Sequence, residues 1–189
     1  MIRDLVLKNR SYRRFKQDVT IEMETLRELV DLARNSASAT NRQPLKFILS
    51  SESEKNALIF QTLSWAGALR DWPGPAEGER PSAYIVILLD KEIGQSAGCD
   101  HGIAAQSILL GATEKGLGGC MIGSAKRDEL AKNLNIPERY ETQLVIALGK
   151  PAETVVLETL EPGQEFTYWR DEDSVHHVPK RKLDDIIVG

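Results

Sequence analysis

Arginine side chains gather around a serine near the start of the chain. Arg10, Arg13 and Arg14 surround Ser11. Guanidinium groups bind phosphate through paired hydrogen bonds, and a serine hydroxyl adds a further donor. A phosphate monoester is therefore one candidate ligand, and a solvated basic turn is the alternative. A second basic cluster, Lys180-Arg181-Lys182, could converge on the same anion.

A glycine-rich segment at residues 116–123 is the second candidate for chemistry. It is not a dinucleotide fingerprint, because that motif needs a glycine where Met121 stands and must open a helix after a strand. Here the segment follows a predicted helix. We interpret it as a strand whose glycines let the backbone approach a flat ligand closely.

Other catalytic classes lack their motifs in this sequence. Cys99, Cys120 and the pair His176-His177 fit no zinc spacing, and adjacent histidines on an extended chain point apart. We predict no metal site and two buried free thiols. The motifs of serine hydrolases, P-loop NTPases and zinc proteases are also missing.

The elements that must position these residues follow from the spacing of apolar and turn-forming residues. In the first half, the pattern predicts a helix at 21–34 capped by Thr20, a loop at 35–44, a strand at 46–49 and a helix at 53–63. Three prolines and two glycines exclude regular structure over 70–81.

The second half contains the predicted core. We expect a central strand at 83–89, a helix at 101–115 ended by Gly116, a strand at 118–123, a helix at 126–134 capped by Ser124, and a strand at 142–149. Residues 150–189 have too little periodic apolar content to pack alone. We expect this tail to extend onto a partner subunit.

Composition limits the class of protein. The chain has 189 residues, 41% of them hydrophobic, and a formal net charge of -4. This length suits a single domain spanning 1–189. The net charge argues against nucleic-acid and acidic-membrane partners. No apolar run reaches about 18 residues, and the charged N-terminus does not match a signal peptide, so we expect a cytoplasmic protein.

Three motifs, in order, carry a family resemblance. They are Arg10-Ser11-x-Arg13-x-Phe15, then Ser38-Ala39-Thr40-Asn41-Arg42-Gln43-Pro44, then Gly116-Leu117-Gly118-Gly119-Cys120-Met121-Ile122-Gly123. Together they make the chain, over roughly residues 3–150, resemble the nitroreductase family of FMN-dependent NAD(P)H oxidoreductases.

The resemblance implies an α+β fold in which helices flank a central mixed β-sheet. It also implies an intertwined homodimer with two FMN molecules at the subunit interface. Arg10 and Ser11 match contacts to the phosphate and ribityl chain, Arg13 matches a contact to the pyrimidine side of the flavin, and Lys180 with Arg181 resembles the pair that completes the phosphate pocket. Two further groups match contacts to the flavin. One is a loop that contacts the flavin from the other subunit, formed by Ala37, Ser38, Ala39 and Asn41. The other is the backbone that passes near flavin N5, formed by Met121, Ile122 and Gly123.

The sequence departs from the family pattern at three places. Asn9 replaces the first of two arginines, Leu45 replaces an aromatic residue, and the variable 70–81 segment has no assigned role. Trp65 and Trp72 either shape a substrate pocket or only pack.

The implied activity needs no catalytic side chain, because the chemistry belongs to the flavin. NADH or NADPH would deliver hydride to flavin N5, and a small electron-poor acceptor such as a nitroaromatic or a quinone would then take it. One alternative is a flavin-binding storage or sensor protein without turnover. Others are reductive dehalogenation, flavin breakdown, or a flavinless interaction protein on the same scaffold.

Overall fold

The central sheet is built around β3 (Ala83–Asp90) and β5 (Tyr140–Pro151). The computed structural model describes residues 1–189. β3 is buried along its whole length, which confirms the prediction of a central strand. It pairs with β2 (Leu45–Ser50) on one side and with β5 on the other. β5 also pairs with β4 (Gly118–Ile122) and, at its end, with β1 (Phe15–Lys16).

The direction of strand pairing shows that the main sheet is almost entirely antiparallel. All pairs among these five strands are antiparallel. A single parallel bridge joins Ser11 to Gly119 beside β4, and only this bridge makes the sheet mixed. The predicted α+β class is confirmed.

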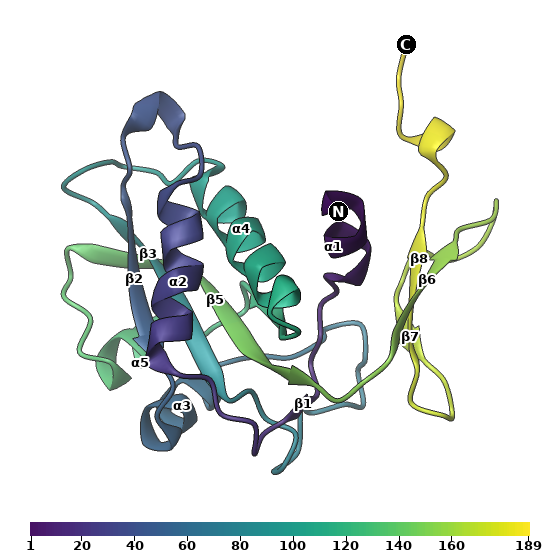
Figure 1. Ribbon diagram of the computed structural model, residues 1–189, viewed down its shortest axis with the longest axis horizontal. Coiled ribbons are helices and arrows are strands. Elements are labelled where there is room, and N and C mark those ends of the chain that lie inside the picture. Colours follow the sequence, from purple (N-terminus) through teal and green to yellow (C-terminus); the bar gives the residue numbers. More distant parts are fainter.

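Two long helices cover one face of the sheet (Figure 1). α2 (Met23–Arg34) and α4 (Asp100–Glu114) lie side by side there. Their apolar side chains pack on alternate residues of the strands, in a cluster that includes Leu26, Leu29, Ile108, Ile85, Ile87 and Ile146. A short N-terminal helix, α1 (Ile2–Lys8), contacts α4.

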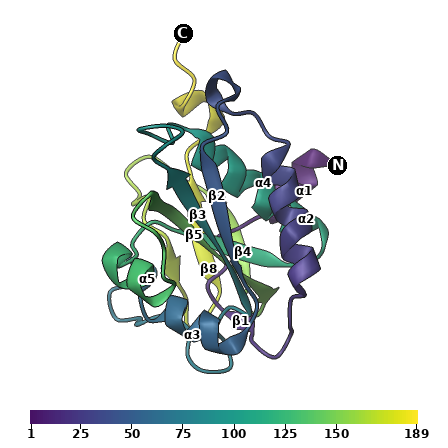
Figure 2. The ribbon, with the colours of Figure 1, turned by 90° about the vertical axis from the view of Figure 1, so that its left-hand side faces the viewer.

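The opposite face is covered by α3 (Ser53–Phe60) and α5 (Arg127–Asn133) (Figure 2). Its cluster uses the other set of alternating strand residues, and it includes Ile59, Leu130, Val86, Val145 and Trp65. The near-continuous apolar run of β3 is thus explained by helices on both faces. No helix in the protein combines the length and the apolar character needed to cross a membrane.

The predicted element ends hold to within three residues, but both predicted N-caps are wrong. α2 starts after Glu22 rather than Thr20, and α5 starts after Lys126 rather than Ser124. The Ser124 hydroxyl instead donates to the Ser64 carbonyl at 3.0 Å. Neither N-cap has a side-chain hydrogen bond, so packing sets these helix starts.

Gly116 ends α4 as predicted. Its φ of +71° is favourable for glycine, and its N–H donates to the Thr113 carbonyl at 3.0 Å. The Leu117 N–H donates to the Ala112 carbonyl at 2.8 Å. These two bonds form a Schellman motif, which turns the chain directly into β4.

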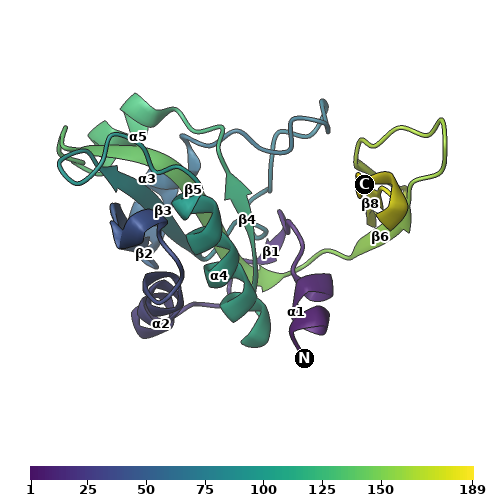
Figure 3. The same cartoon turned by 90° about the horizontal axis from the view of Figure 1, so that it is seen from above.

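The tail forms more regular structure than its low apolar content indicated, and it does so in contact with the main body rather than alone. Residues 155–180 form a small sheet in the order β6 (Val155–Thr159), β8 (His176–Lys180), β7 (Trp169–Arg170). Figure 3 shows this part of the chain beside the main body. A short 3₁₀ turn, Leu183–Asp185, follows. Backbone pairing between distant segments, which periodicity does not reveal, supplies the order that apolar content lacks. The single-domain assignment and the extension onto a partner stay predictions.

Candidate functional site

A cavity of about 320 Å³ lies between the first arginine motif, α4, β4 and β8. Five of the predicted site residues line it together, although they come from three separate parts of the sequence. They are Arg10, Ser11, Arg13, Met121 and Lys180. The structure therefore brings the first motif, the glycine segment and the tail to one place.

A second cavity, of about 170 Å³, adjoins the first. The two share Arg13, Met121 and Tyr168 among their lining residues. The second is further lined by Ile122 and Gly123, which completes the predicted β4 segment. We describe the two adjoining cavities together as one elongated site, with Arg13 among the residues where they meet.

The first cavity is suited to an anion. Arg10, Arg13 and Lys180 line it, and its lining contains no carboxylate. Arg10 donates to the Val6 carbonyl at 2.6 Å, while its Nε is buried without an acceptor. A buried donor without a partner is costly, so a bound anion would remove that cost.

Only some residues of each basic cluster line the cavities. The Arg14 guanidinium pairs with the Glu79 carboxylate, and Arg14 lines neither cavity. Arg181 also lies outside both linings, although its neighbour Lys180 lies within one. Only Arg10, Arg13 and Lys180 therefore gather as the sequence predicted.

Glu153 is a buried acceptor that sequence reasoning missed. Its carboxylate accepts from the N–H groups of Arg13 and Arg14, and from the Arg170 guanidinium at 3.0 Å. Its side chain is 1% exposed. Glu153 therefore ties the start of the tail to the first motif. No local signal marks it, because Arg13 and Arg14 lie about 140 residues away in sequence and Arg170 lies 17 away.

Tyr168 and His176 are two further lining residues that sequence reasoning did not place in the site. The rings of Tyr168 and His176 lie 5.1 Å apart. The Arg13 guanidinium lies 4.8 Å from the centre of the Tyr168 ring. Burial, with Arg13, Arg170 and His177 nearby, lowers the pKa of His176 to about 4.

The two adjacent histidines point apart, as predicted. His177 lies on the outer face of β8, 2.6 Å from a Glu158 oxygen and 3.0 Å from an Asp171 oxygen. Hydrogen bonds to Asp171 and Glu158 raise the pKa of His177. The two imidazoles therefore have opposite electrostatic environments within one strand.

The loop at residues 37–41 lies apart from this site. Ala37 and Ser38 line a different cavity, of about 210 Å³, with Asp100. The Asp100 carboxylate accepts from the Ser38 hydroxyl at 2.6 Å and from the Ala39 N–H at 3.1 Å. None of the predicted residues Ala37, Ser38, Ala39 and Asn41 lines either part of the elongated site. A contribution from another subunit stays a prediction.

The glycines of the segment 118–123, which contains β4, have two different roles. A Cβ at Gly118 would meet the Tyr12 ring at 2.5 Å, and one at Gly119 would meet the Ala147 carbonyl at 2.5 Å. These glycines are therefore required by the protein's own packing, which corrects the ligand-based interpretation at both positions. At Gly123 no heavy atom lies within 4 Å of the Cβ position, and the residue lines the second cavity. The interpretation stands as a prediction there.

The two cysteines differ in burial, and the two tryptophans differ in what they contact. Cys120 is buried, and burial raises its thiol pKa, whereas Cys99 is exposed, so the predicted burial of Cys99 is wrong. Trp65 lines the second cavity, and Trp72 packs under the Arg170 guanidinium at 4.7 Å. Trp65 therefore packs in the core as well as lining this cavity, and Trp72 packs. A role of Trp65 in shaping a substrate pocket stays a prediction.

The sequence matches the model of the Nitroreductase family over residues 6–150. The chain belongs to the nitroreductase family. It is 28% identical over 176 residues to the NAD(P)H nitroreductase YodC of Bacillus subtilis (strain 168), covering 77% of this chain and 87% of that protein.

Solved structures agree with this assignment. An FMN-dependent nitroreductase from Clostridium difficile R20291 superposes with a TM-score of 0.67 and 28% identity, over 81% of this chain and 88% of that one. A nitroreductase family protein from Streptococcus pneumoniae TIGR4 covers all of both chains with a TM-score of 0.71, and its 17% identity supports the fold alone. This nitroreductase-family protein is an oxidoreductase.

Proposed function

We propose that this protein is an FMN-dependent NAD(P)H oxidoreductase that works as a homodimer on a small electron-poor acceptor such as a nitroaromatic or a quinone. The observation that carries the proposal is the elongated site. It has cations and a buried unpartnered donor at one end, and an open β4 backbone at the other.

The cationic end fits the phosphate of FMN. Arg10 and Lys180 supply charge, and the Ser11 hydroxyl supplies a neutral donor. Phosphate oxygens are strong acceptors, so one would satisfy the buried Arg10 Nε. Asn9, which stands where many family members have an arginine, also lines this cavity and offers an uncharged amide.

The other end fits a flat heteroaromatic ring. Beyond the bridge at Gly119, the outer edge of β4 has no neighbouring strand up to Ile122. Free backbone groups on such an edge can hydrogen-bond the polar rim of a ring. The open space at Gly123 permits a close approach there.

When bound, FMN would supply the hydride chemistry, accepting hydride from NAD(P)H and passing it to the acceptor. The residues of the chain bind and orient. Arg13 places a positive charge where the two cavities meet, and there it would stabilise negative charge that develops on a bound group. Cys120 is unsuited to act as a nucleophile, because its thiol is buried and its pKa is raised.

The test is a visible absorption spectrum of the purified protein, recorded before and after anaerobic addition of NADH or NADPH. We expect flavin bands that bleach, and the rates with the two donors will rank them. Flavin bands that do not bleach would favour a binding protein without turnover. The absence of bands after reconstitution with FMN would rule out both functions.

A matched pair of variants links the spectrum to the site. Arg10→Leu removes a cation from the cavity, and we expect at least tenfold weaker FMN binding because a charge-assisted phosphate contact is lost. Arg27→Leu removes an exposed arginine of α2, whose partner is Glu24, and should leave FMN binding unchanged. Equal affinities in the two variants would place the phosphate elsewhere.

A further inference from the structure

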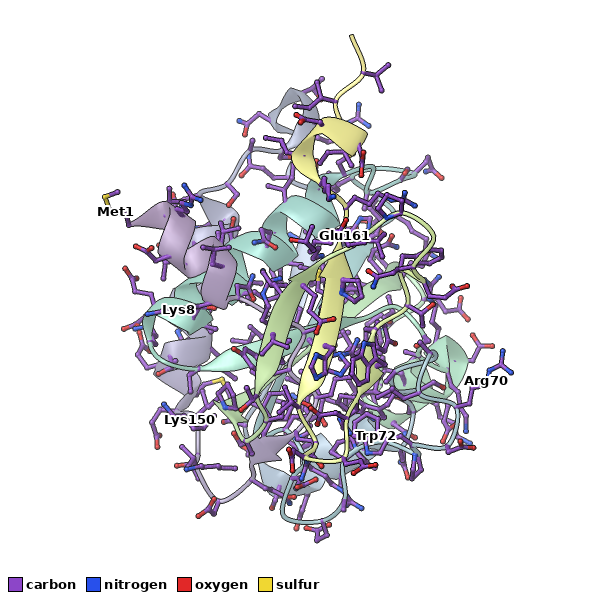
Figure 4. All side chains as sticks on the ribbon, turned by 90° about the vertical axis from the view of Figure 1, so that its right-hand side faces the viewer. Met1, Lys8, Arg70, Trp72, Lys150 and Glu161 are labelled. Atoms are coloured by element: carbon purple, nitrogen blue, oxygen red, sulfur yellow. The ribbon has the colours of Figure 1, made fainter.

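Strand β8 forms one wall of the elongated site. Figure 4 shows the yellow C-terminal strand lying in front of the main body. Side chains alternate along a strand, and His176, Val178 and Lys180 all line the larger cavity. His177, between them, faces the outer side with Glu158 and Asp171. The tail therefore brings an imidazole as well as a lysine to the site.

His176 contacts Arg13 directly. The Arg13 Nη1 and the His176 Nε2 lie 3.3 Å apart. A guanidinium can only donate, so Nε2 must accept with its lone pair. This contact implies a neutral imidazole with its proton on Nδ1, which is buried and has no acceptor within the chain. The imidazole is also fixed in place, since His176 is 1% exposed and lies against the Tyr168 ring.

The acceptors of the Arg13 guanidinium are both uncharged. Besides His176, it donates to the Ser11 carbonyl at 3.2 Å, and it forms no salt bridge. The nearby Glu153 carboxylate instead accepts hydrogen bonds from the backbone N–H of Arg13 and from the Arg170 guanidinium. Arg13 is thus oriented without being neutralised, which leaves its full charge available to a ligand.

We propose that His176 is a positioning residue that holds the Arg13 guanidinium toward the site with its charge intact. Through Arg13, it would raise both the affinity for FMN and the reduction potential of the bound flavin. This inference rests on the proposed function, because it takes FMN as the ligand.

The first test needs no flavin. Nitrogen-15 NMR of the imidazoles in the ligand-free protein reports the tautomer of His176. We expect a neutral ring at pH 7 protonated on Nδ1, with Nε2 as the acceptor. A proton on Nε2, or a charged ring, would overturn the inference whatever the protein binds.

The second test compares three substitutions in the FMN-loaded protein. His176→Gln keeps a neutral acceptor and should stay within threefold of the wild type in FMN affinity. His176→Leu removes the acceptor, and His176→Glu adds a charge that would neutralise Arg13. We expect both to lower the equilibrium constant for flavin reduction about tenfold, a shift of about 30 mV to more negative potential.

The controls distinguish a failure of the proposed function from a failure of the role assigned to His176. His177→Gln changes the outer face of the same strand and should leave the potential unchanged. If the wild type binds no FMN, the proposed function fails. If it binds FMN and all four variants share its potential and affinity, the role of His176 is wrong. If His176→Leu does not fold, the contrast between the glutamine and glutamate variants decides.

Discussion

Two buried side chains of the tail, Glu153 and His176, set the electrostatics around Arg13. Glu153 compensates Arg170 and fixes the backbone of the first motif. His176 accepts from Arg13 without adding charge. Each is nearly inaccessible to solvent, so a change of charge at either position acts in a low-dielectric environment.

At the residue scale, His176 should make stability depend on pH. Its folded pKa of about 4 lies below the unfolded value of 6.5. Between these values the unfolded chain binds more protons, so the free energy of unfolding should fall as pH decreases through this window. The His176 contribution is at most about 3 kcal/mol. Urea unfolding at pH 4.5 and 7 measures it.

The matched variant for this prediction is His176→Gln, which does not titrate. It should lose less stability than the wild type between pH 7 and 4.5. Identical pH dependence of the two proteins would mean that His176 is protonated in the folded state at the same pH as in the unfolded chain.

Glu153→Gln should destabilise the fold. The substitution keeps the size of the side chain but leaves the largely buried Arg170 guanidinium without a counter-charge. Breaking a buried ion pair in this way costs about 3 kcal/mol. Thermal unfolding measures the loss. As a control, Glu161→Gln removes the partner of Lys182 in an exposed pair and should barely change the midpoint.

At the scale of elements, β4 and the residue after it combine a packing requirement with an open position at the second cavity. Gly118 and Gly119 allow Tyr12 and β5 to approach, and Gly123, which follows the strand, is open. The segment 118–123 therefore joins the core to the site. Its first and last glycines should respond differently to the same added methyl group.

Gly119→Ala should destabilise the protein by about 2 kcal/mol. Its Cβ would meet the Ala147 carbonyl, which the sheet holds in place, and the Leu109 side chain at 2.7 Å. Gly123→Ala meets no protein atom, so stability should be retained while FMN affinity falls. Thermal unfolding and FMN titration of both variants separate the two effects. A stable Gly119→Ala protein would contradict the packing argument.

At the scale of the whole molecule, one chain does not assemble all the predicted contacts. The cavity with Ala37 and Ser38 shares no lining residue with the cavity that contains Arg10, Arg13 and Lys180. A second copy could supply the loop, as the family resemblance implies. The tail sheet lies beside the main body (Figure 1), so it adds a wall to the site of its own chain.

Mixed dimers test this arrangement. One variant would carry Arg10→Leu, and another Ser38→Ala with Asn41→Ala, each first shown not to retain FMN. After refolding an equal mixture, half of the dimers contain one copy of each and hence one intact site of two. About a quarter of all sites should then bind FMN. No recovery in the mixture would indicate that a single chain supplies every contact.

Local rules made much of this protein predictable from its sequence. β3 is a continuous apolar run, and α4 ends at a glycine with positive φ; both follow from properties of a few neighbouring residues. Arg10, Ser11 and Lys180, which line the larger cavity, also gather as expected. The tail sheet and Glu153 escaped prediction because their partners are remote in sequence.

The sequence alone therefore determined the family, the α+β class and the residues of the first motif and β4 that line the site. Only the tertiary structure decided the partner of each arginine, since Arg14 pairs with Glu79 while Arg13 contacts His176. It also separated the packing glycines from the open one. The physical reason is that side-chain types are fixed by the chain, whereas partners and burial arise only when distant segments meet.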